Sequence, residues 1–153
     1  MQSQIQHLTN QNNRNIFYYH TAYNWLNLLE SGADLSVFFE LCQCRKIAVY
    51  GVADFGKLLQ KELDRIGSVK IIYFMDRNAE SCRWMGDIPV YLPEELSVAP
   101  EVDLVVVTAI AAFSNVNKLL LQMKPELPVV SLNGIIDSCL DEEWIREMQR
   151  KWK

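Results

Sequence analysis

The sequence contains little histidine and no excess of basic residues. Its two histidines, His7 and His20, lie outside the segments that we predict to form the core, so no imidazole is placed for acid–base catalysis there. Lysine and arginine number 15 against 19 aspartates and glutamates, which gives a formal net charge of −4. Nucleic-acid binding normally requires a basic surface that displaces counterions. We therefore expect no nucleic-acid partner.

Long apolar runs are missing as well. No segment approaches the roughly 20 consecutive apolar residues that a membrane helix requires. The first residues also lack the basic start and the apolar stretch of a signal peptide. We therefore expect no membrane insertion and a cytoplasmic location.

The four cysteines do not form a recognisable framework. Cys42, Cys44, Cys82 and Cys139 are too few and too irregularly spaced for the disulfides of a small secreted domain. The pair Cys42 and Cys44 has the spacing of half a metal site, but no second half follows. We expect free thiols packed near the start of the first strand, and no metal.

Motifs for catalysis are scarce. No Ser-His-Asp or Cys-His arrangement can be assembled around the predicted core. The sequence also lacks a G-x-x-x-x-G-K-[ST] phosphate loop and the Tyr-x-x-x-Lys pair of short-chain dehydrogenases. The sequence therefore favours a binding module that is not catalytic alone.

The remaining composition indicates one folded domain with a substantial core, because 50% of the 153 residues are hydrophobic. Residues 1–20 are rich in glutamine and asparagine, and we predict a flexible polar tail. Residues 21–45 carry helical apolar spacing and form a lead-in, which could equally be a dimerisation arm. Residues 46–138 form the α/β core, with a turn at Asn133-Gly134, and residues 139–153 a C-terminal helix.

Short apolar runs alternate with helical patterns through the core. The expected strands are residues 47–50, 69–75, 88–91, 104–107 and 129–130. The runs are continuously apolar, as expected for parallel strands that are buried on both faces. Right-handed crossovers then favour a three-layer Rossmann-like parallel sheet with strand order 3-2-1-4-5.

The turn after the first strand has the pattern G-x-A-x-x-G. It consists of Gly51, Val52, Ala53, Asp54, Phe55 and Gly56. In the dinucleotide fingerprint the first glycine makes the tight turn, the second admits the pyrophosphate, and the third allows close packing of helix and strand. Ala53 replaces the second glycine. The alternative is that Asp54 caps the helix, in a turn that needs its glycines for packing alone.

Polar groups at the ends of two other strands support a nucleotide site. Asp76 ends the second strand, where a carboxylate accepts hydrogen bonds from a ribose diol. The neighbouring Arg77 could instead pair with a phosphate. Thr108 and Ala109 end the fourth strand beside the expected ligand crevice. These residues favour NAD or a UDP-sugar, although the Asp76-Arg77 segment also fits a simple polar turn.

Several motifs along the core carry a family resemblance. They are Lys46-Ile47-Ala48-Val49-Tyr50-Gly51, Phe55-Gly56-Lys57-Leu58-Leu59, Asp76-Arg77-Asn78, Ile88-Pro89-Val90-Tyr91 and Val105-Val106-Val107-Thr108-Ala109. Together they resemble small Rossmann-like NAD(P)- or nucleotide-sugar-binding domains of bacterial surface-polysaccharide proteins. Such domains accompany glycosyltransferases, sugar acyltransferases and dehydratase-like proteins. The resemblance spans roughly residues 22–138 and identifies a class rather than an activity.

This resemblance implies a nucleotide or nucleotide-sugar pocket at Gly51, Gly56 and Asp76. It also implies a role accessory to polysaccharide biosynthesis, with a glycosyltransferase or a similar protein as partner. Two alternatives remain open: an NAD-dependent nucleotide-sugar oxidoreductase or epimerase that needs a partner chain, and a structural module that has lost its ligand. An apolar stripe on the C-terminal helix, which includes Trp144 and Trp152, either packs on the core or contributes to a homodimer.

Overall fold

The expected apolar runs form the strands of one sheet in the computed structural model, which describes residues 2–152. The sheet has six strands in the order β3-β4-β2-β1-β5-β6. The strands are β1 (Lys46–Tyr50), β2 (Lys70–Met75), β3 (Trp84–Met85), β4 (Ile88–Tyr91), β5 (Leu104–Val107) and β6 (Val129–Ser131). All neighbours pair in parallel except β3, which is antiparallel to β4.

The short strand β3 makes the observed order differ from the expected 3-2-1-4-5. The parallel strands follow one another as β4-β2-β1-β5-β6, and β3 adds an antiparallel edge. Trp84 and Met85 pair with Pro89 and Ile88 across a tight turn. A two-residue strand has too few residues to show alternation or a continuous apolar run, so the sequence pattern did not predict it.

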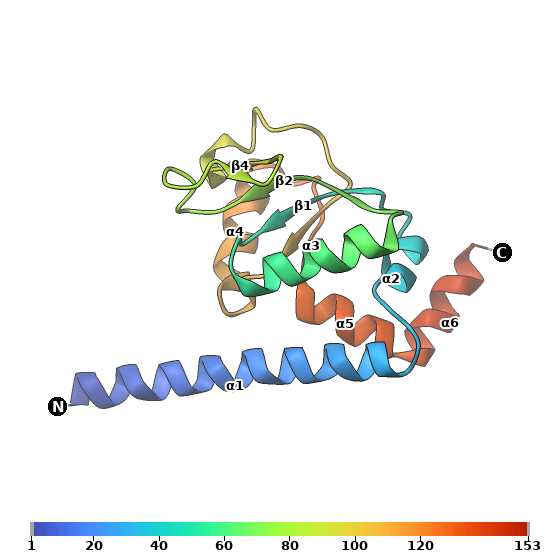
Figure 1. The fold of residues 1–153 in the computed structure, drawn as a ribbon, viewed down its shortest axis with the longest axis horizontal. Coiled ribbons are helices and arrows are strands. Elements are labelled where there is room, and N and C mark those ends of the chain that lie inside the picture. The colour runs from blue at the N-terminus through green and yellow to red at the C-terminus, as the bar shows by residue number, and fades with distance from the viewer. Residues whose placement is uncertain (1, 153) are drawn as a thin grey trace.

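The helices are α1 (Gln2–Glu30), α2 (Ser36–Leu41), α3 (Asp54–Ile66), α4 (Phe113–Met123), α5 (Leu132–Leu140) and α6 (Glu142–Lys151). Short 3-10 turns, η1 (Pro93–Glu95) and η2 (Ile110–Ala112), complete the elements. Figure 1 shows α1 as a long rod that passes beside α3 and α5 and extends beyond the rest of the molecule.

The core consists of two clusters on opposite faces of the sheet, because successive strand side chains point to opposite sides. Ile47 and Val49 of β1 belong to one cluster, together with side chains of α1, α2, α3 and α5. Ala48 and Tyr50 belong to the other, together with side chains of α4. Helices thus contribute to the core on both faces of this mixed α/β fold.

The N-terminal segment differs from the expected polar tail at residues 1–20. Helix α1 begins at Gln2 and continues without a break to Glu30, so the expected boundary at residue 20 falls inside a helix. The Gln- and Asn-rich composition suggested a tail. However, residues 2–30 contain no glycine or proline, the residues that most strongly interrupt a helix.

The C-terminal segment also differs from the prediction. Asn133 and Gly134 do not form a turn between elements, because they lie in the first turn of α5. The Ser131 hydroxyl accepts a 3.1 Å hydrogen bond from the Gly134 amide and caps that helix. Asp141 ends α5 and caps α6 by accepting a 3.1 Å bond from the Trp144 amide. The helix expected at residues 139–153 is therefore α6, which begins at Glu142, and a further helix, α5, stands before it.

The aromatic side chains of the C-terminal segment contact α2. The rings of Trp144 and Phe38 stack with centroids 5.8 Å apart. The indole N–H of Trp152 donates a 2.9 Å hydrogen bond to the carbonyl of Leu41. The predicted apolar stripe thus packs, at least in part, against its own chain.

Candidate functional site

The glycine turn lies at the carboxyl ends of the central strands. Gly51 follows β1, Asp76 follows β2 and Thr108 follows β5. Strand β1 pairs with β2 on one side and with β5 on the other, so the chain leaves the centre of the sheet in two directions. Open α/β sheets bind ligands in the crevice at such a switch point.

A cavity of about 510 Å³ occupies this crevice, within the range of sites for small molecules. It brings together most of the residues that the sequence predicted. From the turns it is lined by Gly51, Val52, Ala53, Asp54, Phe55, Asp76, Thr108 and Ala109. The other lining residues, Asn15, Tyr18, Tyr19 and Ala22, come from α1.

Two predicted site residues do not line this cavity. Gly56 is buried in the first turn of α3, where a Cβ would overlap the carbonyl oxygen of Gly51. Arg77 is exposed beside Asp76. Gly56 therefore serves the close packing of the turn against the helix, and Arg77 contributes no side chain to the cavity wall.

Gly51 is required by the geometry of the turn. Its φ of +117° is one that L-residues rarely adopt, and an added Cβ would lie 2.5 Å from Thr108 Oγ1. The amide of Gly51 donates a 2.9 Å hydrogen bond to the carbonyl of Met75 at the end of β2. The turn is thus held against both neighbouring strands.

Thr108 holds the turn from the other side. Its buried hydroxyl lies 3.1 Å from the carbonyl oxygen of Tyr50 and 3.2 Å from that of Gly51, and donates to these two acceptors. A hydroxyl has a single proton to donate. The donor capacity of Thr108 is therefore used within the protein, which makes it a positioning group for Gly51.

Asp76 connects the end of β2 to the glycine turn. One carboxylate oxygen accepts a 3.3 Å hydrogen bond from the Val52 amide, and the other accepts a 2.8 Å bond from the Asn78 amide. An ionised carboxylate has about four lone-pair sites, so two acceptor sites remain for a ligand. Asp76 is half-buried at the cavity wall.

The start of α3 is not capped in the way that we considered. Ala53 is the N-cap residue and has no side-chain oxygen, while Asp54 is the first helical residue and is exposed. The interpretation of Asp54 as the N-cap is therefore wrong. Its carboxylate nevertheless lies in the first turn, where the helix dipole favours a negative charge.

The charged residues that line the cavity, Asp54 and Asp76, are both acidic. Such a wall favours hydroxyl and N–H donors of a ligand and repels anions. A phosphate group would have to rely on main-chain amides at the start of α3. The arrangement therefore fits the sugar portion of a ligand better than several exposed phosphates.

Sequence reasoning missed the contribution of α1 to this site. The ring of Tyr18 packs against Phe55 of the glycine turn, with centroids 5.3 Å apart, and Tyr19 also lines the cavity. The missed signal was the absence of helix-breaking residues before Thr21. It would have extended the helix back to these tyrosines.

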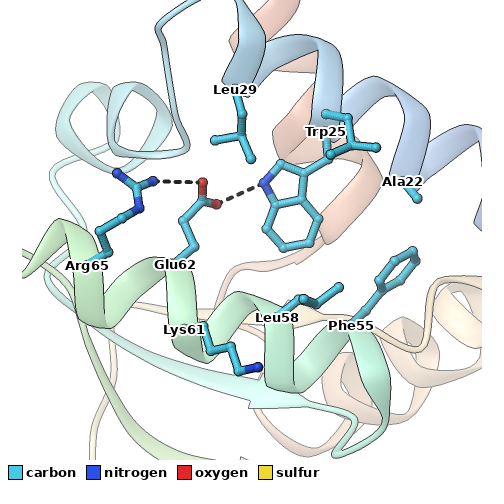
Figure 2. A pocket seen from close by; sticks show the side chains of 9 residues that line it. Ala22, Trp25, Leu29, Phe55, Leu58, Lys61, Glu62 and Arg65 are labelled. Carbon is cyan, nitrogen blue, oxygen red and sulfur yellow. Dashed lines mark hydrogen bonds and ion pairs between the residues drawn. The ribbon is translucent and has the colours of Figure 1, made fainter.

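A second cavity of about 410 Å³ lies between α1 and α3 (Figure 2). Its lining is mostly apolar and includes Leu26, Leu29 and Leu58. At one end Trp25 and Arg65 both bond to the carboxylate of Glu62. The bond from Trp25 fastens α1 to α3 beside the candidate site, and Arg65 pairs with the same carboxylate from within α3.

The four cysteines are free thiols, and burial suppresses the ionisation of two of them. Burial raises the pKa of Cys44 and Cys139 to about 11 each, so these thiols stay protonated at neutral pH. Within residues 2–152, no group of three or more His, Cys, Asp or Glu side chains is arranged to hold a metal ion. In the same range no helix is both long and apolar enough to span a bilayer.

Comparison with known proteins adds no family assignment. No protein-family model matches the chain, and no curated protein shows significant similarity to it.

Proposed function

We propose that this chain is a Rossmann-like module that binds a nucleotide or a nucleotide-sugar and is not catalytic alone. The observation that carries the proposal is the cavity at the switch point between β1 and β5. It is walled by a glycine turn, a half-buried carboxylate and aromatic side chains. On this proposal α3 and α5 cover one face of a three-layer domain, and α4 covers the other.

The proposed ligand is NAD or a UDP-sugar. Asp76 would accept hydrogen bonds from a ribose diol with its remaining lone pairs, because only two of its acceptor sites bond to amides. The main-chain amides of Ala53 and Asp54 would face the phosphates. The ring of Tyr18 or Tyr19 offers a flat surface for a base.

We further propose, from the resemblance of the core motifs, a role accessory to the biosynthesis of cell-surface polysaccharide. In that role the module would present its ligand to a glycosyltransferase or a related enzyme. The cavity walls contain no histidine, lysine, arginine or cysteine. A histidine or lysine for proton transfer would therefore come from the partner, while the carboxylates of Asp54 and Asp76 are acid–base groups of this chain.

A thermal-shift titration tests the proposal. NAD, NADP, UDP and a UDP-sugar should be compared, and a saturable rise in melting temperature is expected for NAD or the uridine ligands. The rise should be smaller for NADP, because Asp76 disfavours a 2′-phosphate. Stabilisation by none of the four compounds would contradict the proposal.

Substitution of single carboxylates tests where the ligand binds. Asp76→Asn should abolish the ligand-induced shift, since it removes the charge and half of the acceptor capacity. Asp87→Asn changes an exposed carboxylate in the turn between β3 and β4 and should leave the shift intact. The shift is compared within each variant, so that any change in intrinsic stability cancels. An unaltered shift in Asp76→Asn would remove the site from the glycine turn.

A second candidate function is structural. Gly51, Gly56, Thr108 and Asp76 each have a packing or hydrogen-bonding role inside the protein. A module without a ligand would explain all four residues. It predicts destabilised variants at these positions together with no response to any nucleotide.

A further inference from the structure

The first half of helix α1 packs little on its own chain. Every residue from 2 to 17 is exposed, and this half extends beyond the rest of the molecule (Figure 1). A helical stretch of this length is marginal in water without packing, and asparagine is a poor helix former. Packing on a surface outside its own chain would stabilise this stretch.

Six of the eight large apolar residues of α1 that are exposed fall on one side of the helix, while Phe17 and Leu29, each 39% exposed, lie outside that side. The six follow one another mostly in steps of three and four, the spacing of a helix–helix contact. We call them the α1 stripe: Ile5, Leu8, Ile16, Tyr19, Tyr23 and Leu26. Leu8 is 64% exposed and Leu26 is 62% exposed. The buried residues Thr21, Trp25 and Leu28 use a different side of the helix to pack on the body.

We propose that the α1 stripe is a dimer interface, and that α1 pairs with α1 of a second copy in antiparallel orientation. Ile16 then lies near the two-fold axis, Ile5 lies near Leu26 of the partner subunit, and Leu8 lies near Tyr23 of the partner subunit. The contact is isologous, as in most homodimers. It covers the unsupported half of each helix.

Charge selects a second copy over a charged partner. Arg14 and Glu30 are the only lysine, arginine, aspartate or glutamate residues of α1. The six stripe residues therefore carry no charge that a basic or acidic partner would recognise, and Glu30, one turn beyond Leu26, meets no like charge when two stripes pair in antiparallel orientation.

Charge also selects the antiparallel orientation. Glu30 lies at the carboxyl end of α1, where the helix dipole disfavours an acid, and the first turn of α1 contains none. An antiparallel partner brings Glu30 next to the amino end of the other helix, where its charge is favourable. A parallel pair would instead place the two Glu30 side chains side by side.

The two halves of α1 also differ in how they pack on the body of the protein, and antiparallel pairing matches this difference. The half that carries Tyr23 and Leu26 packs on the body through Trp25 and Leu28, while the half that carries Ile5 and Leu8 has no such backing. Antiparallel pairing sets each unbacked half against a backed half, close to the apolar cavity between α1 and α3 (Figure 2). Parallel pairing would leave two unbacked halves with only each other.

The interface reaches the candidate site but does not depend on a ligand. Tyr19 belongs to the α1 stripe and also lines the cavity at the glycine turn. The partner's helix therefore passes the mouth of that cavity. Dimerisation stands or falls independently of nucleotide binding.

Light scattering coupled to gel filtration tests the interface. The intact chain should have twice its 17.7 kDa mass, and Leu8→Glu combined with Ile16→Glu should reduce it to a monomer. Asn10→Glu adds the same charge to an exposed residue on the opposite side of the helix and should leave the dimer intact. Both substituted stripe residues are exposed, so the core is unchanged, and a cooperative melt of the variant confirms that. A monomeric wild type, or a double variant that stays dimeric, would overturn the proposal.

Cysteine cross-linking under mild oxidation tests the orientation. Ile16→Cys should link two chains, and so should the double variant Ile5→Cys, Leu26→Cys. These two positions are about 30 Å apart on one helix, so they cannot link within a chain. Neither single variant, Ile5→Cys or Leu26→Cys, should link above the background of the unmodified chain with its native cysteines. Linking by each single variant would show a parallel pair and overturn the antiparallel assignment.

Discussion

The indole N–H of Trp25 on α1 donates a 2.9 Å hydrogen bond to the carboxylate of Glu62 on α3, and both side chains are buried. Arg65 pairs with the other carboxylate oxygen at 3.3 Å (Figure 2). Burial raises the pKa of Glu62 above its ordinary value, and the bonds from Trp25 and Arg65 offset only part of that rise. The contact that fastens α1 to α3 therefore depends on pH.

The raised pKa of Glu62 means that the folded protein binds this proton more tightly than the unfolded chain does. The stability that Glu62 contributes is present below its unfolded pKa and is lost as pH rises through its folded pKa. Glu62→Gln keeps an oxygen that accepts from Trp25 but does not ionise. We expect wild type to lose stability relative to this variant as the pH rises from about 4.3, the ordinary pKa of a glutamate, toward neutrality. Urea denaturation across that range measures the difference.

Glu80→Gln is the control for this prediction, because Glu80 is exposed in the loop after β2. Its pH profile should run parallel to that of wild type. If the profiles of wild type and Glu62→Gln also run parallel, Glu62 does not titrate in the range stated.

Substitution of Gly51 by alanine should destabilise the protein more than substitution of Gly67. Both glycines have positive φ, +117° and +82°, but only at Gly51 would a Cβ meet other atoms, at 2.5 Å from Thr108 Oγ1. Gly67→Ala should cost about 1–2 kcal/mol for the backbone conformation alone. Gly51→Ala should cost roughly 1–3 kcal/mol more, since the added methyl is overpacked. Equal losses in urea denaturation would show that the turn tolerates the methyl group.

Thr108→Val should destabilise the protein by about 1–3 kcal/mol, because it removes the buried hydroxyl that donates to the carbonyls of Tyr50 and Gly51. Thr21→Val is the matched control. Thr21 is also buried, but its hydroxyl bonds to the carbonyl of Phe17 within one turn of the same helix. Its loss should be smaller by denaturant titration. A larger loss at Thr21 would contradict the role of Thr108 in holding the turn.

Tyr50→Phe should leave stability unchanged or raise it by up to about 1 kcal/mol. Among the described residues, the buried hydroxyl of Tyr50 has no hydrogen-bond partner, although water solvates it in the unfolded chain. Removal of the hydroxyl eliminates that desolvation penalty and retains the packing of the ring. Thermal and urea melts measure the sign. A loss above 1 kcal/mol would indicate that the hydroxyl is bonded in solution.

Local patterns in the sequence were sufficient for much of the core. The apolar runs that became β1 and β5 are buried along nearly their whole length, so continuous hydrophobicity predicted them. The glycine turn was also predictable, since a strand, a tight turn and a helix follow one another directly in the chain. Patterns of this kind depend on neighbours in sequence, and they appear without knowledge of the fold.

The prediction from composition was wrong where polar or turn-like residues are helical. The Gln- and Asn-rich residues before Thr21 are polar and exposed, yet they are helical. Asn133-Gly134 has the composition of a turn but follows the Ser131 cap inside α5. The residues before Thr21 are helical because they are continuous with the helix that runs to Glu30. Asn133 and Gly134 are helical because Ser131, just before them, caps their helix.

The apolar strands, the glycine turn and the acidic residue after β2 follow from residues that are neighbours in the chain. The contacts that those groups make depend on the tertiary fold. Val52 and Asp76 are 24 residues apart, Trp25 and Glu62 are 37 apart, and Gly51 and Thr108 are 57 apart. Such contacts depend on the order of the strands and on the placement of α1 beside α3. These are set by the packing of the whole core, and no local pattern encodes them.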